Sequence, residues 1–456
     1  MFKINTITLS LLALLLVMSF ASCASDTTSD LPLPSKDMKA YLQVKVTVEG
    51  SGDTRASRAD KEPQGGEDGN GREQGINHEN EVNSLTVLLY ESDKKDIAEA
   101  DAKIDYVYTF TGLTASTPSS GGNVTYSTGP REIDPVIVGK NYHVLVIANA
   151  GDMTSRCKGK KISEIRDMQM DKVCTRNVDI ANFTDFVMSS KKDAKIDFSG
   201  KSGSGTGTES DPYVVDVNIE RLAARIDIIP NATYVDTDKG YYYNVMDGTN
   251  VIGGFKLESV TPSKVMTSGE YLIKRVSSDK DVSSVTYFGL EDKDADNKAT
   301  NYVVCPWTKD RTGLTLSNAE GPTSLYNVKN TTSTSTAVGE ASYILDYVME
   351  NTTTDNDEGH STGLIFKGKY FETSDWDAIK KQPKAGSTGT DKEYTYTLRH
   401  SDPSGSGTIS DPMHFGVVRN NIYQVKVDGV EGKSKGLKLT INVRKWATYT
   451  HDETTM

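Results

Sequence analysis

The sequence contains few cysteines, which excludes a disulfide framework as the main source of its stability. Only four occur in 456 residues. Cys23 lies in the N-terminal segment, so Cys157, Cys174 and Cys305 remain, which is an odd number. The sequence leaves it open whether Cys157 and Cys174 pair, although structural disulfides look unimportant. We therefore expect a fold that is held together by its hydrophobic core.

The paired histidines that zinc hydrolases use are also missing. The six histidines form no His-Glu-x-x-His motif, and no two of them stand four positions apart. We predict no catalytic residues and a protein that is not an enzyme.

Two short segments resemble ligand-binding loops, but each lacks residues that the chemistry requires. Gly200-Lys201-Ser202 is typical of the end of a phosphate loop, yet the required earlier glycine position holds Lys195. Alternating aspartates from Asp292 to Asp296 resemble the start of a calcium loop, but Asn297 replaces its glycine and Val303 its final glutamate. We predict no metal and no cofactor.

Charge of one sign does not collect anywhere along the chain. The net charge is −12, with acidic and basic residues mixed. A basic stripe that could follow a phosphate backbone is not visible, so we expect no nucleic-acid partner.

Long apolar runs are absent except at the N-terminus. Residues 7–20 are mostly apolar, a length of about 14, whereas a membrane-spanning helix needs roughly 20. A run of this length after Lys3 is typical of a signal peptide. The following Ala21-Ser22-Cys23 resembles a lipobox. We expect a signal peptide over residues 1–22 and acylation of Cys23, for example by palmitate, so that lipid anchors the precursor in the outer membrane.

What the chain does contain favours strands and turns. It is rich in Thr, Ser, Val, Tyr, Gly and Asp. The length exceeds what one ordinary core encloses, which suggests two domains. We expect a lipidated propeptide over residues 23–58, an N-terminal β-sandwich over 59–222 and a C-terminal β-sandwich over 223–456, with short helices.

Residues 41–48 alternate strictly and predict a half-buried strand. One face of this strand carries four aliphatic side chains, namely Leu42, Val44, Val46 and Val48. Residues 49–78 then show no apolar periodicity and read as a protease-accessible loop. Arg55 and Arg58 are each followed directly by an alanine in this loop, and both are candidate cleavage sites for an arginine-specific protease.

A second alternating segment lies near the C-terminus. It also has four aliphatic side chains at a period of two, namely Leu437, Leu439, Ile441 and Val443. The pattern alone has two interpretations, a strand of its own domain or a strand that could fill a groove vacated by residues 41–48. Burying four such side chains is worth on the order of 6–12 kcal/mol before entropy costs.

Between these segments the pattern predicts many short strands and one clear helix. The helix is expected over residues 162–173. Residues 136–149 are expected to form a turn followed by a buried strand. Further strands are expected at 82–90, 187–190, 213–228, 251–258, 301–305, 343–349, 363–371, 393–398, 413–427 and 436–450.

Several motifs in this order and spacing resemble the fimbrillins, the type V pilins of Bacteroidales-type bacteria, and most closely the shaft subunits of minor (short) fimbriae. The motifs are Glu79–Val87, Gly139–Asn149, Phe186–Ser189, Ile219–Arg225, Tyr347–Asn351, Thr362-Gly363, Val417–Tyr423, and Val443 with Trp446.

The resemblance implies two transthyretin-like β-sandwich domains and an assembly route. An outer-membrane lipoprotein precursor would be cut at Arg55 or Arg58, lose strand 41–48, and accept in its place about residues 436–456 of a neighbour. The donor side chains would be the four aliphatic ones of 437–443. The implied partners are further copies, accessory pilins, the arginine-specific protease and a possible host receptor or glycan, and the final location is an extracellular fimbrium used for adhesion.

Two matters remain open in the sequence. The chain could be a shaft, tip or anchor subunit. The alternative function is a monomeric, lipid-anchored adhesin or glycan-binding lipoprotein, with Trp307, Trp376 and Trp446 as aromatic residues that could line a glycan site.

Overall fold

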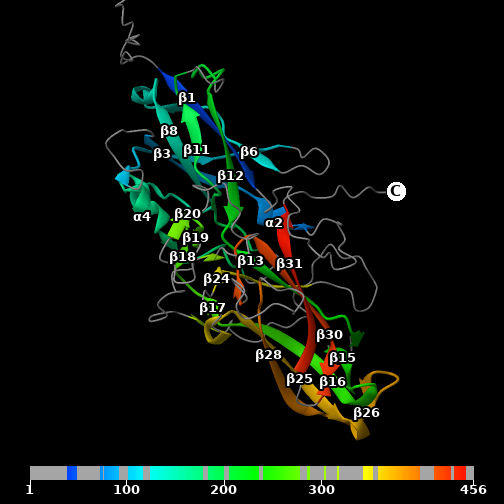
Figure 1. The fold of residues 1–456 in the computed structure, drawn as a ribbon. Helices are drawn as coiled ribbons and strands as arrows, with labels where there is room; N and C mark the ends of the chain where they lie inside the picture. Colours follow the sequence, from blue (N-terminus) through cyan, green and yellow to red (C-terminus); the bar gives the residue numbers. More distant parts are fainter. Residues whose placement is uncertain are drawn as a thin grey trace, which may run out of the picture.

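Alternation of apolar and polar side chains produces strands along most of this chain. The computed structural model describes residues 39–48, 72–74, 77–91, 101–116, 124–177, 183–199, 205–235, 240–277, 285–287, 302–303, 316–317, 343–352, 358–400, 415–432 and 436–447. Two large sheets follow one another along an elongated molecule (Figure 1). The expectation of a mostly β fold of sandwich type with short helices is confirmed.

The first sheet has ten strands and is built from the N-terminal part of the chain. Its order is β4 (Tyr106–Thr111), β3 (Ser84–Glu91), β8 (Asn141–Ala148), β10 (Met188–Ser190), β12 (Tyr213–Arg221), β1 (Ala40–Val48), β6 (Thr125–Ser127) and β5 (Thr114–Ala115). Off this path, β11 (Ala194–Asp197) pairs with β8, and β7 (Arg131–Ile133) pairs with β1.

The second sheet also has ten strands. Its order is β2 (Arg72–Gln74), β31 (Gly436–Ala447), β30 (Asn421–Glu431), β15 (Gly240–Asp247), β16 (Asn250–Ser263), β25 (Gly363–Glu372) and β28 (Thr390–Thr397). The strand β13 (Ala224–Ile229) pairs with β30 and with β23 (Tyr343–Val348), and β14 (Thr233–Val235) pairs with β15.

Short strand pairs and helices complete the described chain. The pairs are β9 (Gln169–Met170) with β18 (Glu270–Tyr271), β24 (Asn351–Thr352) with β29 (Gly416–Val417), β26 (Trp376–Asp377) with β27 (Gln382–Pro383), and β17 (Val265–Met266) with β22 (Leu316–Ser317). The strand β19 (Arg275–Ser277) lies between β20 (Val285–Tyr287) and β21 (Tyr302–Val303). The helices are α2 (Asn77–Asn80), α3 (Thr154–Cys157), α4 (Ile162–Arg166), η2 (Pro135–Ile137), η5 (Glu358–His360) and η6 (Thr373–Asp375).

The chain crosses from the first sheet to the second between Arg221 and Ala224, where the expected continuous strand 213–228 is interrupted. We call each large sheet, together with the segments packed on it, a unit. Leu222 donates its amide hydrogen to the carbonyl oxygen of Val187 in the first unit, at 2.9 Å. The carbonyl oxygen of Ala223 accepts a hydrogen bond from the amide of Asn420, at 2.8 Å. Two residues therefore redirect the backbone from one set of partners to the other.

The helix expected over residues 162–173 is wrong in its length. The helix α4 ends at Arg166, and Met170 belongs to β9, which pairs with β18 of the following unit. Met170 is buried. Tertiary pairing of residues 169–170 thus overrides a pattern that is compatible with a longer helix.

The expectation of an irregular loop over residues 49–78 is also corrected where the structure describes this segment. Residues 72–74 form β2, which pairs in parallel with residues 445–447 of β31. Asn77 and His78 begin α2. Backbone pairing with a distant strand produces this order, and a scan for apolar periodicity cannot detect it.

Cys157 and Cys174 are free thiols and both are buried. Burial raises the pKa of Cys157 to about 11 and that of Cys174 to about 12. The expectation that structural disulfides are unimportant holds for this pair, and the two side chains contribute to the hydrophobic core of the first unit.

Candidate functional site

The strand β1 lies inside the first sheet rather than at its edge. It runs parallel to β12, with Leu42 opposite Tyr213 and Val48 opposite Ile219. On its other side it pairs antiparallel with β6 and β7. Because strands flank it on both sides, its removal would divide the sheet and open a groove between β12 and the β6 and β7 strands.

The inward face of β1 is fully buried. Leu42, Val44, Val46 and Val48 are 0% exposed, and Ala40 is 1% exposed. The intervening residues are only partly buried, which confirms the strand predicted over residues 41–48 and its alternation. These four side chains correspond to about 6–12 kcal/mol of apolar burial.

Polar contacts fix the register of β1 against its antiparallel neighbours. The amide of Val44 donates to Oγ1 of Thr128 at 2.9 Å, and the Thr128 amide donates back to the Val44 carbonyl at 2.9 Å. The side-chain amide of Gln43 donates to the Thr128 carbonyl at 2.9 Å. The hydroxyl groups of Thr47 and Thr125 lie 3.0 Å apart. Thr128 makes three of these four contacts and therefore holds the middle of β1 in register.

The C-terminal alternating segment forms β31 in the second sheet. It pairs antiparallel with β30 along its whole length, with Lys445 opposite Asn421 and Gly436 opposite Glu431. Ile441 is buried, whereas Leu437 and Leu439 pack against the core of the second unit while remaining partly exposed. The four predicted donor positions are therefore on a strand that already has a place in its own sheet; the side chain of Val443 lies outside the described residues.

Several other predicted site residues lie outside the described residues. These are Cys23, Arg55, Arg58, Trp307, and the two segments 200–202 and 292–303 except residues 302–303. Trp376 is described and is 4% exposed, with its indole nitrogen donating to Oδ1 of Asn244 at 2.8 Å. Burial excludes its ring as an open sugar-binding platform. The backbone of Trp446 pairs with Glu73 in β2.

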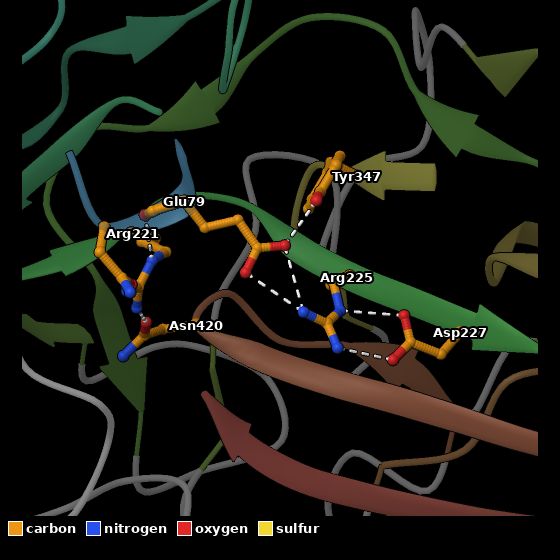
Figure 2. A network of polar contacts seen from close by, with 7 residues as sticks. Glu79, Arg221, Arg225, Asp227, Tyr347 and Asn420 are labelled. Atoms are coloured by element: carbon orange, nitrogen blue, oxygen red, sulfur yellow. Dashed lines mark hydrogen bonds and ion pairs between the residues drawn. The ribbon is translucent and has the colours of Figure 1, made fainter. Parts of the chain in front are cut away.

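A buried ionic network lies where the two sheets meet (Figure 2). Glu79, in α2, accepts hydrogen bonds from the guanidinium of Arg225 at 3.1 and 3.2 Å and from the hydroxyl of Tyr347 at 2.5 Å. Arg225 also binds both carboxylate oxygens of Asp227, at 2.9 and 2.7 Å. These four side chains come from α2, β13 and β23, and all are at most 1% exposed.

Arg221, at the end of β12, ties the same network to the turn before β30. Its guanidinium donates to the backbone carbonyl of Glu79 at 2.8 Å and to Oδ1 of Asn420 at 3.0 Å, and it also bonds Oδ1 of Asn80. Since β12 is the parallel neighbour of β1, a strand that directly flanks β1 ends in this network.

Electrostatics keep Arg225 charged. Burial alone lowers the pKa of a guanidinium, but the carboxylates of Asp227 and Glu79 outweigh it and raise the pKa of Arg225 above its ordinary value. For Arg221 burial prevails over attraction to Glu79 and lowers the pKa to about 10. Both side chains are therefore protonated at neutral pH.

A second buried ion cluster lies beside the first. Arg419 donates to the carboxylate of Glu350 at 3.3 Å and to the carbonyls of Leu272 at 3.2 Å and Tyr271 at 2.6 Å. The carboxylate of Glu270 lies 3.4 Å from the same guanidinium. Burial, opposed by Arg419, raises the pKa of Glu270 well above its ordinary value.

The segment that carries Glu270 belongs to the second unit but packs on the first. The pair β18–β9 joins residues 270–271 to residues 169–170. The hydroxyl of Ser189 donates to the carbonyl of Leu272 at 2.7 Å, and Leu272 lies in the hydrophobic core of the first unit. Together with the two ion clusters, this segment fastens the two units to one another.

Residues from four of the sequence motifs meet at the junction of the two units. Glu79, Arg221 and Arg225, Tyr347 with Glu350, and Arg419 with Asn420 each come from a different motif, and all of them meet here. We did not predict this convergence. The signal was present in the form of charged residues directly beside buried strands, which are rare without a partner.

Metal and membrane sites have no support among the residues that the structure describes. No group of three or more His, Cys, Asp or Glu side chains there could hold a metal ion. Nor does the described part include a helix that is long and apolar enough to cross a membrane.

Residues 40–221 match the family model of the major fimbrial subunit protein (FimA). The match starts at the first residue of β1 and ends at the last residue of β12, so it spans β1 and the strands on both sides of it. The resemblance to the fimbrillin family that the motifs predict is confirmed. A search of the curated proteins finds no match.

Solved structures also resemble the chain. A proposed cell adhesion protein from Parabacteroides distasonis ATCC 8503 is 15% identical, with a TM-score of 0.50 over 91% of this chain and 99% of that chain. At this identity the likeness shows a shared fold. The fimbrilin (FimA) from Porphyromonas gingivalis W83 is 15% identical with a TM-score of 0.40 over 90% and 99% of the two chains. The C-terminally truncated tip fimbrial protein Mfa3 from Porphyromonas gingivalis is 12% identical, with a TM-score of 0.38 over 90% of this chain and 100% of that chain.

Proposed function

We propose that this protein is a structural fimbrial subunit that polymerises by exchanging its first strand for a strand of a neighbouring copy, and that it has no catalytic role. The observation that carries the proposal is the position of β1. It is an interior strand whose inward face is fully buried, and it is joined to the rest of the chain through the segment containing Arg55 and Arg58. The fimbrial family match over residues 40–221 supports it.

In the proposed route, lipid on Cys23 holds the precursor at the outer membrane. Cleavage after Arg55 or Arg58 then releases the segment that contains β1, which removes the membrane anchor and opens the groove together. The lost burial of four aliphatic side chains, about 6–12 kcal/mol, makes the open state unfavourable and drives its refilling. Unpaired backbone groups along β12 and β6 add to this drive, because exposed strand edges accept a further strand.

The proposed donor is the C-terminal segment from about residue 436 to the end. Its aliphatic positions 437, 439, 441 and 443 have the spacing of 42, 44, 46 and 48. To donate, β31 must separate from β30 along its length and from β2 at residues 445–447. The partial exposure of Leu437 and Leu439 lowers the cost of that step relative to a fully buried strand. The division into two domains at residues 222–223 and the final fimbrial location at the cell surface are parts of the same proposal.

The burial of Ile441 in its own unit decides which variant tests the donor role. Ile441→Asp would impair both folding and donation, so Leu439→Asp is sharper because Leu439 is only partly buried. Lys438→Asp is the matched control, since it places the same carboxylate one residue away on the exposed face.

The experiment treats each purified precursor with an arginine-specific protease and follows the N-terminus by mass spectrometry and the product by unheated SDS gel. The wild type and Lys438→Asp should lose the N-terminal segment and form ladders of oligomers. Leu439→Asp should be cut equally fast but remain monomeric, while still accepting a wild-type donor. Ladders from Leu439→Asp as long as those of the wild type would remove the donor assignment, and a cleaved wild type that stays monomeric at high concentration would refute the proposed function.

A monomeric, lipid-anchored glycan-binding protein is the competing class. The burial of Trp376 removes one of its three candidate aromatic residues. The protease experiment also tests this class, because a lipid-anchored monomer would not need to lose β1 in order to function.

A further inference from the structure

The described residues include two large hydrophobic side chains that are exposed, and they lie at opposite ends of the molecule. Ile379 is 95% exposed and Val136 is 55% exposed. Ile379 lies in the hairpin of β26 and β27, at the end of the second unit that is farthest from the first (Figure 1). Val136 lies in η2, directly after β7, which pairs with the first residues of β1.

We propose that these two ends dock on one another between successive copies of the chain, so that the Ile379 end of one copy contacts the Val136 end of the next. We call the first the hairpin pole (residues 376–384) and the second the β1-entry pole (Glu132, Asp134, Val136 and Glu209). The proposal rests on the proposed function and adds to it the surface by which two copies align before a strand is exchanged.

Hydrogen bonds make the turn of the hairpin pole rigid, although the side chain of Ile379 at its tip is exposed. The carboxylate of Asp377 accepts hydrogen bonds from the amides of Ile379 and Lys380, at 3.1 and 3.0 Å. Lys381 adopts a φ of 52°, which closes the turn. A turn braced in this way presents Ile379 in one orientation, which reduces the entropy lost on binding.

An aromatic cluster fixes the base of the hairpin pole. Trp376 packs against Tyr242 and Phe371, with ring centroids 6.1 and 5.8 Å apart. A Cβ atom on Gly254 would lie 2.0 Å from the Trp376 ring, so only glycine leaves room for the indole over β16. A separate small hydrophobic cluster therefore supports the turn, while Ile379 at the tip of the turn stays exposed.

The two poles carry opposite charges. Between residues 376 and 384 the hairpin pole has three lysines, Lys380, Lys381 and Lys384, against one aspartate, although Glu372 and Asp375 precede it. The three lysines are exposed. At the β1-entry pole Glu132, Asp134 and Glu209 are exposed, and the exposed Arg131 beside them leaves the acidic side chains in excess. Opposite charges around an apolar contact favour association of unlike surfaces and disfavour association of like ones.

Cleavage would make the β1-entry pole more acidic. In the precursor, Nζ of Lys39 lies 2.9 Å from a carboxylate oxygen of Glu132, and both side chains are more than half exposed. Lys39 precedes β1, so a cut at Arg55 or Arg58 removes it and leaves Glu132 without this partner. A lysine of the hairpin pole of another copy could then take its place, which would couple docking to processing.

The path of β31 agrees with this arrangement. Gly436, its first residue, pairs with Glu431 beside the β15 strand end at Met246, whereas Lys445 pairs with Asn421 near the domain junction. A strand peeled from β30 would therefore stay attached at the hairpin pole, and its 12 residues would reach about 40 Å beyond it. It would enter the next groove from the Ala40 end, in the direction of β1 and parallel to β12.

Because the contact joins two different surfaces of identical chains, it repeats without closing and generates a filament. The test uses charge reversal. The double variant Lys380→Glu/Lys381→Glu should elongate about tenfold more slowly or worse at low salt after cleavage. Adding Glu132→Lys and Asp134→Lys to the same chain should restore the rate. Lys158→Glu/Lys160→Glu, a change of equal charge at exposed positions between α3 and α4, should elongate like the wild type.

Failure of this proposal and failure of the proposed function are separable. If the wild type forms ladders and the Lys380/Lys381 reversal elongates at the wild-type rate, the docking surface is refuted while strand exchange stands. If no ladder forms at all, docking is tested by a Val136→Cys/Ile379→Cys variant of the full precursor after cleavage. Intermolecular disulfides that survive heating in SDS, and that neither single variant forms, support the docking; their absence overturns it.

Discussion

Glu79→Ala removes the one carboxylate that Arg225 and Tyr347 share at the junction of the two units. Three hydrogen bonds are lost, two from the guanidinium at 3.1 and 3.2 Å and one from the hydroxyl at 2.5 Å. Breaking a buried ion pair on one side costs about 3–5 kcal/mol. Arg225 retains both bonds to Asp227, so we expect about 3 kcal/mol, at the lower end of that range.

The assay is urea unfolding of the full precursor, followed by far-ultraviolet circular dichroism. A loss of about 3 kcal/mol lowers the midpoint by roughly 1 M urea if the slope is about 3 kcal/mol per M. Glu79→Gln keeps an acceptor for Tyr347 but loses the charge, so its midpoint should lie between the wild type and Glu79→Ala. The control is Glu393→Ala, whose pair with Lys367 is half exposed at 3.5 Å and worth less than about 1 kcal/mol. Equal midpoints for Glu79→Ala and Glu393→Ala would refute the reasoning.

Two further predictions concern the second ion cluster and the hairpin pole. Because burial raises the pKa of Glu270 above its usual 4.5, folding takes up a proton at this group, and its contribution to stability falls as the pH rises from 4.5 toward the raised pKa. The unfolding free energy of Glu270→Gln relative to the wild type should therefore increase over this range in urea titrations, and a difference that is constant with pH would contradict the assignment. Gly254→Ala should destabilise the chain by about 1–3 kcal/mol by crowding the Trp376 ring and should shift tryptophan emission, whereas Gly429→Ala, where a Cβ meets no atom within 4 Å, should do neither.

Most of the correct strand predictions came from the local alternation of apolar and polar side chains. The segment 41–48 was assigned correctly because every second side chain is aliphatic, and burial on one face of a sheet requires that period. The strands 82–90 and 363–371 were placed to within two residues at each end for the same reason. The scan failed at residues 72–74 and 169–170, because these short strands exist through partners far away in the chain.

In the candidate site, too, the local features were predictable from the sequence and the long-range pairing was not. The apolar side chains of β1 were recognisable from sequence, as were those of β31, since hydrophobic periodicity is a local property. The pairing of β31 with β30 decides that Ile441 is buried while Leu437 and Leu439 are partly exposed, and this determines which variant can test donation.

The sequence by itself determined the mostly β fold, the alternating strand β1 and the resemblance to the fimbrillins, because each depends on residues close together in the chain. Only the tertiary structure decided that Glu79, Arg225 and Tyr347 meet in one buried network, and that the β26 hairpin and the start of β1 lie at opposite ends (Figure 1). Charges from distant segments can be buried only when folding brings their partners within hydrogen-bond distance, and no local pattern encodes that distance.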